Sequence, residues 1–242
     1  MRKTGYFVGT LTAGALALSA ASPGVAAATK TVAIWEMNER PDATTMVDTG
    51  DNGIDGTIGS AVMTGKRVDD GGTGYQWSNT APNKPPAKPE RLVVVEDRWL
   101  KPGNADYAIT VRFRTTRPFG NIVQKGQSQN RRGFFKWQIP HGKLTCVFRG
   151  YDNDTGERLS RSVNSGPTPL NDGKWHVVTC KRTEKQVRMT VDGTLVRRAL
   201  GPTGRIYNKV PLTIGGKSNC DQVTTTCDYF VGSIDYVRIA RG

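Results

Sequence analysis

The pattern of apolar and polar positions along the chain is typical of β-strands. In Tyr107–Arg114 every second residue is apolar, so the apolar side chains would all face one side of a sheet. Beyond the N-terminal segment we find no amphipathic helical stretch of useful length. Short segments of this kind, separated by Gly, Asn, Asp and Pro, predict strands at Thr31–Glu36, Arg91–Glu96, Tyr107–Arg114, Asn121–Lys125, Phe134–Ile139, Leu144–Arg149, Lys174–Arg182, Gln186–Val191, Leu195–Leu200, Pro211–Ile214 and Phe230–Ile239.

Turn residues between these segments predict hairpins. The pair Asp192-Gly193 separates two alternating segments, which is a strong signal for a two-residue hairpin loop. His141-Gly142 divides two further segments in the same way. The Pro-rich stretch 81–89 cannot pair in a central strand and predicts an exposed connection. Strands at this spacing indicate an all-β sandwich or barrel that forms a single domain.

The first residues predict a cleaved secretory signal peptide at 1–28. Arg2 and Lys3 form a positive n-region, Tyr6–Ala21 is apolar, and small residues follow at the spacing that signal peptidase recognises. A transmembrane anchor is the alternative, but the segment is shorter than the roughly 20 residues of a span and lacks a basic flank. We therefore expect a mature, secreted domain of residues 29–242 with no membrane span after signal cleavage.

The four cysteines of a secreted chain predict two disulfides. Four cysteines allow three pairings. Cys146 and Cys180 each lie in a predicted strand, whereas Cys220 and Cys227 bracket a short polar loop, so we expect pairs 146–180 and 220–227. A zinc site is the alternative, but Cys220 and Cys227 lack a second Cys/His pair at finger spacing.

The net charge adds a preference for anionic partners. The full chain carries +13, and removal of Arg2 and Lys3 with the signal leaves +11. Such a balance favours acidic glycans, wall polymers or nucleic acid. Because the basic residues are scattered through most of the predicted strands, the charge is also compatible with a solvated secreted surface, and we expect no specific nucleic-acid partner.

Several segments together resemble the laminin G signature. LNDGKWHV at 170–177 combines an acidic-Gly turn with a Trp-His strand, and a strand ending in Asp192-Gly193 follows. LTIGG at 212–216 and FVGSIDYVRI at 230–239 resemble the next and the closing strands of the family. WEMNE at 35–39 with DTG at 48–50 resembles its opening strand and loop. The matches run in order across nearly the whole mature chain.

The chain thus resembles bacterial secreted proteins with a laminin G-like domain of the concanavalin A-like superfamily. The resemblance implies a jelly roll, an all-β sandwich of two antiparallel sheets packed face to face with the first and last strands adjacent. It does not imply one ligand, because this fold carries lectins, glycosidases, lyases and adhesion modules.

The same resemblance implies one structural calcium ion near the chain ends, as in many bacterial relatives. The matching positions are Glu39, Asp48 and Asp235, and such carboxylates suit calcium, which takes six to eight oxygen ligands. Asn38 stands where relatives often have Asp, which lowers the charge of the site. The alternative is that Asp48 caps a turn and Asp235 fixes the edge of a sheet.

Catalytic patterns find little support. Glu96-Asp97 is the nearest approach to a glucanase carboxylate pair, yet neighbouring strand residues point to opposite faces. A lyase-like set of Gln138, His141 and Tyr229 is weakened because Pro140 displaces the histidine into a turn. Only two histidines are present, and no Ser-His-Asp pattern accompanies them.

Loop aromatics and arginines are the better candidates for a binding site. Trp99, Tyr151 and Tyr207 lie in predicted loops, where rings can stack on sugars, and Arg131 and Arg132 could bind carboxylate or sulfate. The alternative is that these loop side chains only cover sheet ends. The remaining tryptophans are expected in the core: Trp35, Trp77, Trp137 and Trp175.

The sequence as a whole predicts a secreted, monomeric, non-catalytic binding module. Its expected ligand is an extracellular carbohydrate or cell-surface polymer, with an acidic glycan favoured by the charge. Two alternatives stay open: a polysaccharide-degrading lyase or hydrolase on the same fold, which needs converging titratable residues, and a protein-binding adhesion module, which needs an exposed apolar patch.

Overall fold

The computed structural model describes residues 29–69, 71–78, 90–218 and 228–242, together with Met1. The predicted signal peptide, the Pro-rich stretch 81–89 and the pair Cys220 and Cys227 lie outside the described residues.

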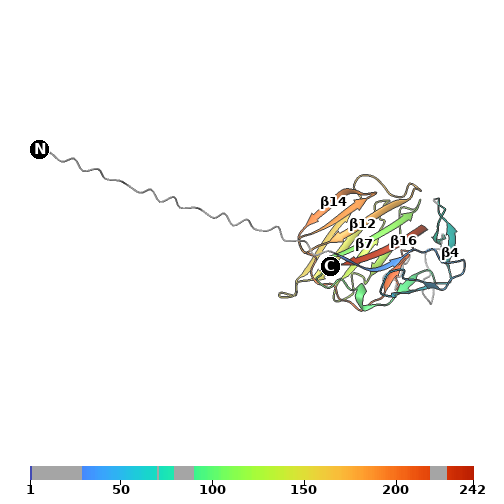
Figure 1. Ribbon diagram of the computed structural model, residues 1–242, viewed down its shortest axis with the longest axis horizontal. Coiled ribbons are helices and arrows are strands. Elements are labelled where there is room, and N and C mark those ends of the chain that lie inside the picture. The colour runs from blue at the N-terminus through green and yellow to red at the C-terminus, as the bar shows by residue number, and fades with distance from the viewer. Residues whose placement is uncertain (2–28, 70, 79–89, 219–227) are drawn as a thin grey trace.

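Two antiparallel sheets form a sandwich. Figure 1 shows the strands of the first, sheet A, side by side from β14 to β4. The last strand, β16, pairs with the first, β1, so the first and last strands are adjacent, as expected. In spatial order sheet A contains β14 (Thr194–Leu200), β13 (Gln186–Val191), β12 (His176–Arg182), β7 (Tyr107–Arg114), β16 (Gly232–Arg241), β5 (Thr73–Trp77) and β4 (Val62–Arg67), with β1 (Lys30–Trp35) paired to β16.

Sheet B forms the other layer and carries the connections that bear the candidate site. A short 3-10 helix, η1 (Arg98–Leu100), follows one of its strands. In spatial order sheet B contains β11 (Arg158–Asn164), β10 (Thr145–Tyr151), β9 (Phe134–Gln138), β8 (Asn121–Lys125), β15 (Leu212–Ile214), β6 (Val93–Val95), β3 (Gly56–Ile58) and β2 (Thr45–Met46). The predicted two-sheet antiparallel sandwich is confirmed.

The core lies between the sheets and follows the alternation of the sequence. Tyr107, Ile109, Val111 and Phe113 of β7 are fully buried, and the residues between them face outward.

The predicted turn at Asp192-Gly193 is confirmed as a two-residue loop between the paired residues Val191 and Thr194. His141-Gly142 also forms a tight turn, but within a longer connection, because β9 and β10 pair only up to Gln138 and Thr145. Asp192 and Gly193 have φ of 48° and 81°, and His141 and Gly142 have φ of 54° and 77°, as hairpin turns with two left-handed residues require.

The disulfide between Cys146 and Cys180 is confirmed and joins β10 of sheet B to β12 of sheet A across the core. One prediction about the core is wrong. Trp35, Trp77 and Trp137 are buried in it, but Trp175 is only partly buried and lies beside Arg112 and Arg114.

Trp175 differs because it precedes β12, and its ring lies 4.7 and 4.9 Å from the guanidiniums of two outward-facing β7 residues, Arg112 and Arg114. Cation–π stacking on a sheet surface replaces core packing there.

Five strands of the described chain were not predicted from the sequence: β2, β3, β4, β5 and β11. In β11 only Val163 is buried, so its sequence lacks alternation. In β4, Gly65 with φ of 65° interrupts the strand at an irregularity in its pairing with β5. In the described part of the chain, no helix has the length and apolarity of a bilayer-spanning segment.

Candidate functional site

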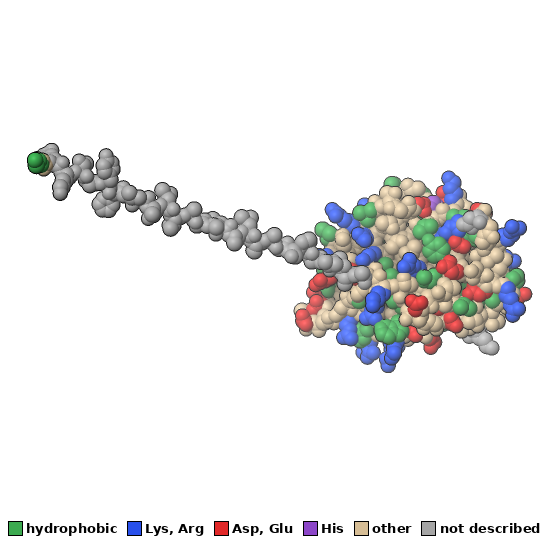
Figure 2. All heavy atoms as spheres, viewed as in Figure 1, with side chains coloured by type: hydrophobic (Ala, Val, Ile, Leu, Met, Phe, Trp, Pro, Cys, Tyr) green, Lys and Arg blue, Asp and Glu red, His purple; other side chains and the backbone are tan. Residues whose placement is uncertain are grey.

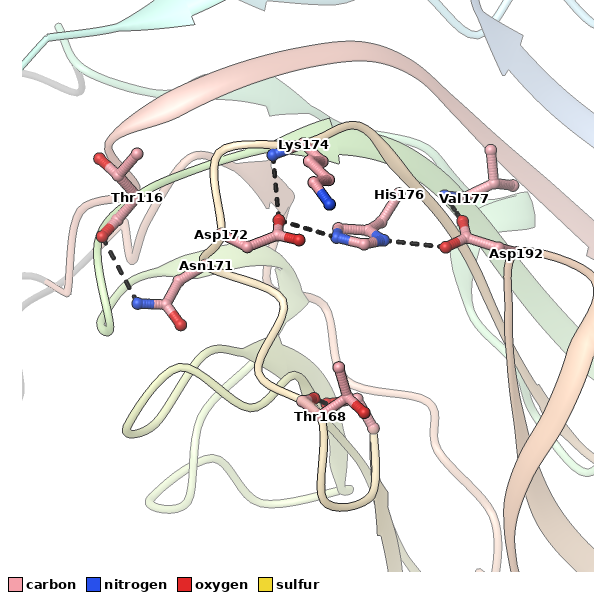
Figure 3. A network of polar contacts seen from close by, with 9 residues as sticks. Thr116, Thr168, Asn171, Asp172, Lys174, His176, Val177 and Asp192 are labelled. Carbon is pink, nitrogen blue, oxygen red and sulfur yellow. Dashed lines mark hydrogen bonds and ion pairs between the residues drawn. The ribbon is translucent and has the colours of Figure 1, made fainter.

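A histidine held between two carboxylates is the clearest polar network of the domain (Figure 3). His176 Nε2 lies 3.0 Å from Asp172 Oδ1, and its Nδ1 lies 2.9 Å from Asp192 Oδ2. Asp172 also accepts the amide of Lys174, and Asp192 accepts that of Val177. The Lys174 amide, followed by the hydrogen bond from His176, lowers the pKa of Asp172.

This network clamps a turn to a hairpin rather than presenting a catalytic base. A general base needs a ring nitrogen within reach of a proton on the substrate or nucleophile. Both nitrogens of His176 face carboxylates, and its side chain is only 12% exposed. The network therefore joins the turn at Asp172 to the β13–β14 turn at Asp192.

The residues of the lyase-like alternative are only partly brought together. Gln138 pairs in register with Asn121, which in turn bridges to Tyr229. His141 instead contacts the ring of Phe119, with centroids 5.5 Å apart. For the glucanase alternative, Glu96 lines an open hollow while the neighbouring Asp97 caps η1.

The three carboxylates of the predicted calcium site are each engaged by hydrogen-bond donors. Asp48 accepts backbone amides of Ile34, Gly50 and Ile54 at 2.9–3.0 Å. Glu39 accepts the hydroxyl of Tyr75, whose pKa is raised by burial and by this bond. The bonds to Asp48 join the 48–54 turn to the backbone of β1.

Asp235, the third of these residues, accepts a 2.6 Å charged hydrogen bond from Arg112. Within the described residues, no group of three or more His, Cys, Asp or Glu side chains is arranged to hold a metal ion. Glu39, Asp48 and Asp235 therefore do not form a ready calcium site in this arrangement, and calcium binding stays a prediction.

The tertiary structure gathers arginines and tyrosines at one end of sheet B, and we call Arg132, Tyr151, Arg158, Arg205 and Tyr207 the arginine–tyrosine cluster. Tyr207 has the guanidinium of Arg205 4.5 Å from its ring centroid and that of Arg132 at 5.4 Å. Tyr151 pairs with Arg158 in the β10–β11 ladder and bridges to Arg205 on its other side. Paired residues of adjacent strands share a face, so Tyr151 lies between two arginines.

Backbone contacts build this cluster from three distant segments. Arg205 and Tyr151 exchange backbone hydrogen bonds of 2.8 and 3.1 Å, and Tyr207 donates its amide to Arg132. The close approach needs glycine on both sides: a Cβ on Gly150 would lie 2.5 Å from the Arg205 carbonyl, and one on Gly204 2.7 Å from the Tyr151 backbone.

Arg132 itself has φ of 75°, a left-handed conformation that is uncommon for a residue with a side chain. Its backbone is held there by the amide of Tyr207, while its side chain and that of the neighbouring Arg131 are exposed. The loop thus presents the side chains of Arg131 and Arg132 to solvent, and the guanidinium of Arg132 lies beside the Tyr207 ring.

A buried arginine positions the segment that carries Arg205. Arg182 is 2% exposed and donates five hydrogen bonds of 2.7–3.1 Å. Burial lowers the pKa of Arg182 to about 10, so it stays charged at neutral pH. Its acceptors are the carbonyls of Gly103, Ala105 and Gly204 and the hydroxyl of Thr203.

Two hollows lie on either side of the segment around Ala105. One, of about 400 Å³, is lined by Asp106, Tyr151 and Arg205 among others. The second, of about 350 Å³, is lined by Ala105, Trp99, Lys30 and Arg241 among others. Trp99 is 47% exposed, with the guanidinium of Arg98 5.3 Å from its ring.

The structure therefore brings Tyr151, Tyr207 and Arg132 together, with Arg131 next to them in the chain, and places Trp99 in a separate hollow. Sequence reasoning missed Arg205. The sequence feature that could have identified Arg205 is its position two residues before Tyr207, because alternate residues of an extended segment share a face.

Arg158 and Arg182 carried no comparable signal, since their roles depend on partners far along the chain. On the face seen in Figure 2, basic and acidic side chains are interspersed, so charge alone does not mark a site there.

Comparison with known proteins completes this description. The model of the laminin G domain family matches residues 113–241, which is 129 of the 242 residues. The laminin subunit alpha of Drosophila melanogaster is 26% identical over 143 residues, covering 54% of this chain and 4% of that protein. Human neurexin-3-beta is 31% identical over 121 residues, covering 48% of this chain and 18% of that protein.

Among solved structures, the binding domain of botulinum neurotoxin DC, in complex with rat synaptotagmin II, has a TM-score of 0.57 at 13% identity, covering 86% of this chain and 47% of that chain. Identity at this level shows a shared fold alone. The chain spans less than a fifth of the length of either curated relative.

Proposed function

The chain belongs to the laminin G domain family, and we propose that it is a secreted, non-catalytic module that binds an extracellular acidic glycan. The observation that carries this proposal is the arginine–tyrosine cluster. Guanidinium groups match the planar geometry of carboxylate and sulfate, and aromatic rings offer faces to sugars.

The members of the cluster share one surface. Arg158 and Arg205 flank Tyr151 in register, and Arg132 and Arg205 both lie over Tyr207. Guanidiniums that already stack on a tyrosine ring lose less side-chain freedom on binding than free ones, because the ring restricts them beforehand. An anionic sugar on this surface would contact a guanidinium group and a tyrosine ring at the same time.

Trp99 supplies a second contact for the same ligand. Its ring is half exposed in a hollow that also contains the cations Lys30 and Arg241. The segment around Ala105 separates this hollow from the one that contains Tyr151 and Arg205, so a polymer rather than a single sugar would reach both.

Secretion is supported by the disulfide between Cys146 and Cys180, because structural disulfides persist in oxidising compartments. A non-catalytic role is supported by His176, whose ring nitrogens are both engaged by carboxylates. Partners of either class suit this fold: the toxin binding domain that shares it is described in complex with SialylT and, separately, with synaptotagmin II.

Binding to a panel of neutral and acidic polysaccharides, at low and high salt, tests the proposal. We expect retention on an acidic class that partly survives high salt. Arg205→Ala and Tyr207→Ala should weaken it by about tenfold each, as expected for the loss of one charged hydrogen bond or stacking contact. Arg67→Ala removes an exposed arginine on β4 of sheet A and is the matched control.

Two results would contradict the proposal. Retention on every anionic polymer that disappears with salt would mean that the charge acts only by non-specific attraction. No retention on any polysaccharide would exclude the glycan and leave a protein partner.

A further inference from the structure

Strand β14 forms one edge of sheet A and exposes apolar side chains. Figure 1 shows it at the margin of the sheet, and among the described strands it pairs only with β13. Leu195 is 54% exposed and Leu200 is 70% exposed. Exposure of leucine side chains to water is unfavourable. Exposed edge strands are also the sites at which a strand of another chain can pair with a sheet.

Strand β11 of sheet B also approaches β14, but it forms no strand pairing with it, so in the described part of the chain most outward backbone groups of this edge have no partner strand. In an antiparallel pair, every second residue turns its N–H and C=O away from the partner strand. At the C-terminal end, the Leu200 carbonyl accepts a 2.7 Å hydrogen bond from Arg161. No other backbone hydrogen bond beyond the β13 pairing is recorded for 194–200 within the described residues, so the open stretch is 194–199.

The side chains that face outward alternate between apolar and basic. Leu195 pairs with Thr190 and Leu200 with Gln186, on the outer face of β13, and Arg198 lies between the two leucines. The outer face of β14 therefore carries a leucine, an arginine and a leucine in sequence order.

A row of positive charge runs from this edge across the outer face of sheet A. Arg198 lies directly opposite Arg188, and Arg188 lies directly opposite Lys181, so three cations cross three neighbouring strands in one row. Strands β12, β13 and β14 contain no Asp or Glu. Lys181 is the member with a recorded acidic neighbour, Asp106 at 3.6 Å. Like charges placed opposite one another are unfavourable, and an anionic partner would relieve them.

We propose that the β14 edge is a docking surface for an extended acidic segment of a partner protein, which adds as a further strand of sheet A. Main-chain hydrogen bonds would come from 194–199. Acidic side chains of the segment would face Arg198 and Arg188, and its apolar side chains would cover Leu195 and Leu200. This binding goes beyond the proposed glycan function and uses the other sheet.

A second copy of the chain fits this edge less well. Antiparallel pairing of β14 with itself about its middle would place Arg197 or Arg198 opposite one of the same two residues of the copy. A polyanion alone would satisfy the cations but would leave the leucines and the edge amides unused. An acidic strand uses all three features.

The test is fluorescence anisotropy with a short labelled peptide whose residues on the outer face would be valine, glutamate and valine, with threonine at the positions between them. N-methylation of alternate residues on one edge of the peptide should weaken binding by about tenfold or more, and N-methylation on the other edge should not, because only one edge faces β14. Arg198→Glu should weaken binding by about tenfold and should improve binding of the same peptide with lysine in place of glutamate, by reversing one charge contact.

Arg67→Glu, an exposed arginine of β4, is the matched control, and its binding should equal that of the unmodified protein. Hydrogen exchange should slow at the amides of 194–199 when the peptide is bound. Equal binding of both methylated peptides would overturn the proposal, and displacement of the peptide by dextran sulfate in that case would identify a polyanion surface. Absence of peptide binding would also overturn it. A glycan variant such as Arg205→Ala leaves this assay unchanged, so the two proposals fail separately.

Discussion

Replacing Arg182 by methionine tests the link between the core and the arginine–tyrosine cluster. The guanidinium is buried and ties together two segments, one containing Gly103 and Ala105 and the other containing Thr203 and Gly204. Methionine is unbranched and apolar and has no donor, so it keeps the packing of the aliphatic part of Arg182 and removes the hydrogen bonds.

The expected loss of stability follows from these bonds. Four acceptors lose their donor, and each buried unsatisfied acceptor costs roughly 1–3 kcal/mol. Removal of the buried charge offsets part of this loss of stability, because desolvation of a guanidinium is itself unfavourable by several kcal/mol. We expect the free energy of unfolding to fall by about 3 kcal/mol and Tm by about 6–12 °C for a domain of this size.

Urea denaturation and thermal melting of the purified domain measure this change. Arg205→Met, an exposed arginine of the same segment, is the control and should change the free energy of unfolding by less than about 0.5 kcal/mol. Arg182→Lys should recover only part of the loss, since one ammonium cannot reach both segments.

Hydrogen exchange at 203–207 should accelerate in Arg182→Met, and acidic-glycan binding should weaken with it. A value for Arg182→Met within about 1 kcal/mol of the unmodified protein would refute the reasoning, because it would mean that the acceptors find water or other donors at no cost.

Four further predictions concern stability. Replacement of Cys146 and Cys180 by alanine should lower the free energy of unfolding by roughly 4 kcal/mol from loop entropy, measured by urea denaturation against the oxidised protein; an unchanged midpoint would exclude that role. Burial lowers the pKa of Lys125 to about 8, so between that pH and the ordinary lysine value the unfolded state holds more protons, and stability should rise with pH by about 2 kcal/mol from about pH 8 to about pH 10 relative to Lys125→Met. Parallel pH profiles of the two proteins would contradict this. Asp48→Ala, which removes the acceptor of three amides, should cost about 2–3 kcal/mol, whereas Asp69→Ala at an exposed position should be nearly neutral. Thermal melts in calcium and in chelator test the predicted calcium ion: a higher Tm in calcium would support it, and identical melts would remove it.

Strands whose alternation is strong could be read directly from the sequence. Tyr107–Arg114 and Gln186–Val191 were predicted with the bounds that the structure shows, because a period of two fixes both the strand and its buried face. The Asp192-Gly193 turn was equally clear, since its backbone needs residues that tolerate positive φ.

Strands without that period needed tertiary contacts. β11 is a strand because β10 pairs with it over its whole length, although Val163 is its only buried residue. The position of Trp175 also depends on tertiary contacts, because its ring stacks on two arginines of β7 at the sheet surface. Partners of this kind lie far apart in the chain and leave no local pattern.

The sequence by itself determined the all-β class, the strands with a clear period of two and the residue types suited to binding, because composition, period and turn chemistry are local. Only the tertiary structure decided which of those residues meet. It placed Tyr151, Arg132 and Tyr207 together through Arg205, and it left Trp99 in another hollow. Their meeting depends on glycines that let two backbones touch and on the buried charge of Arg182, and both act through space rather than along the chain.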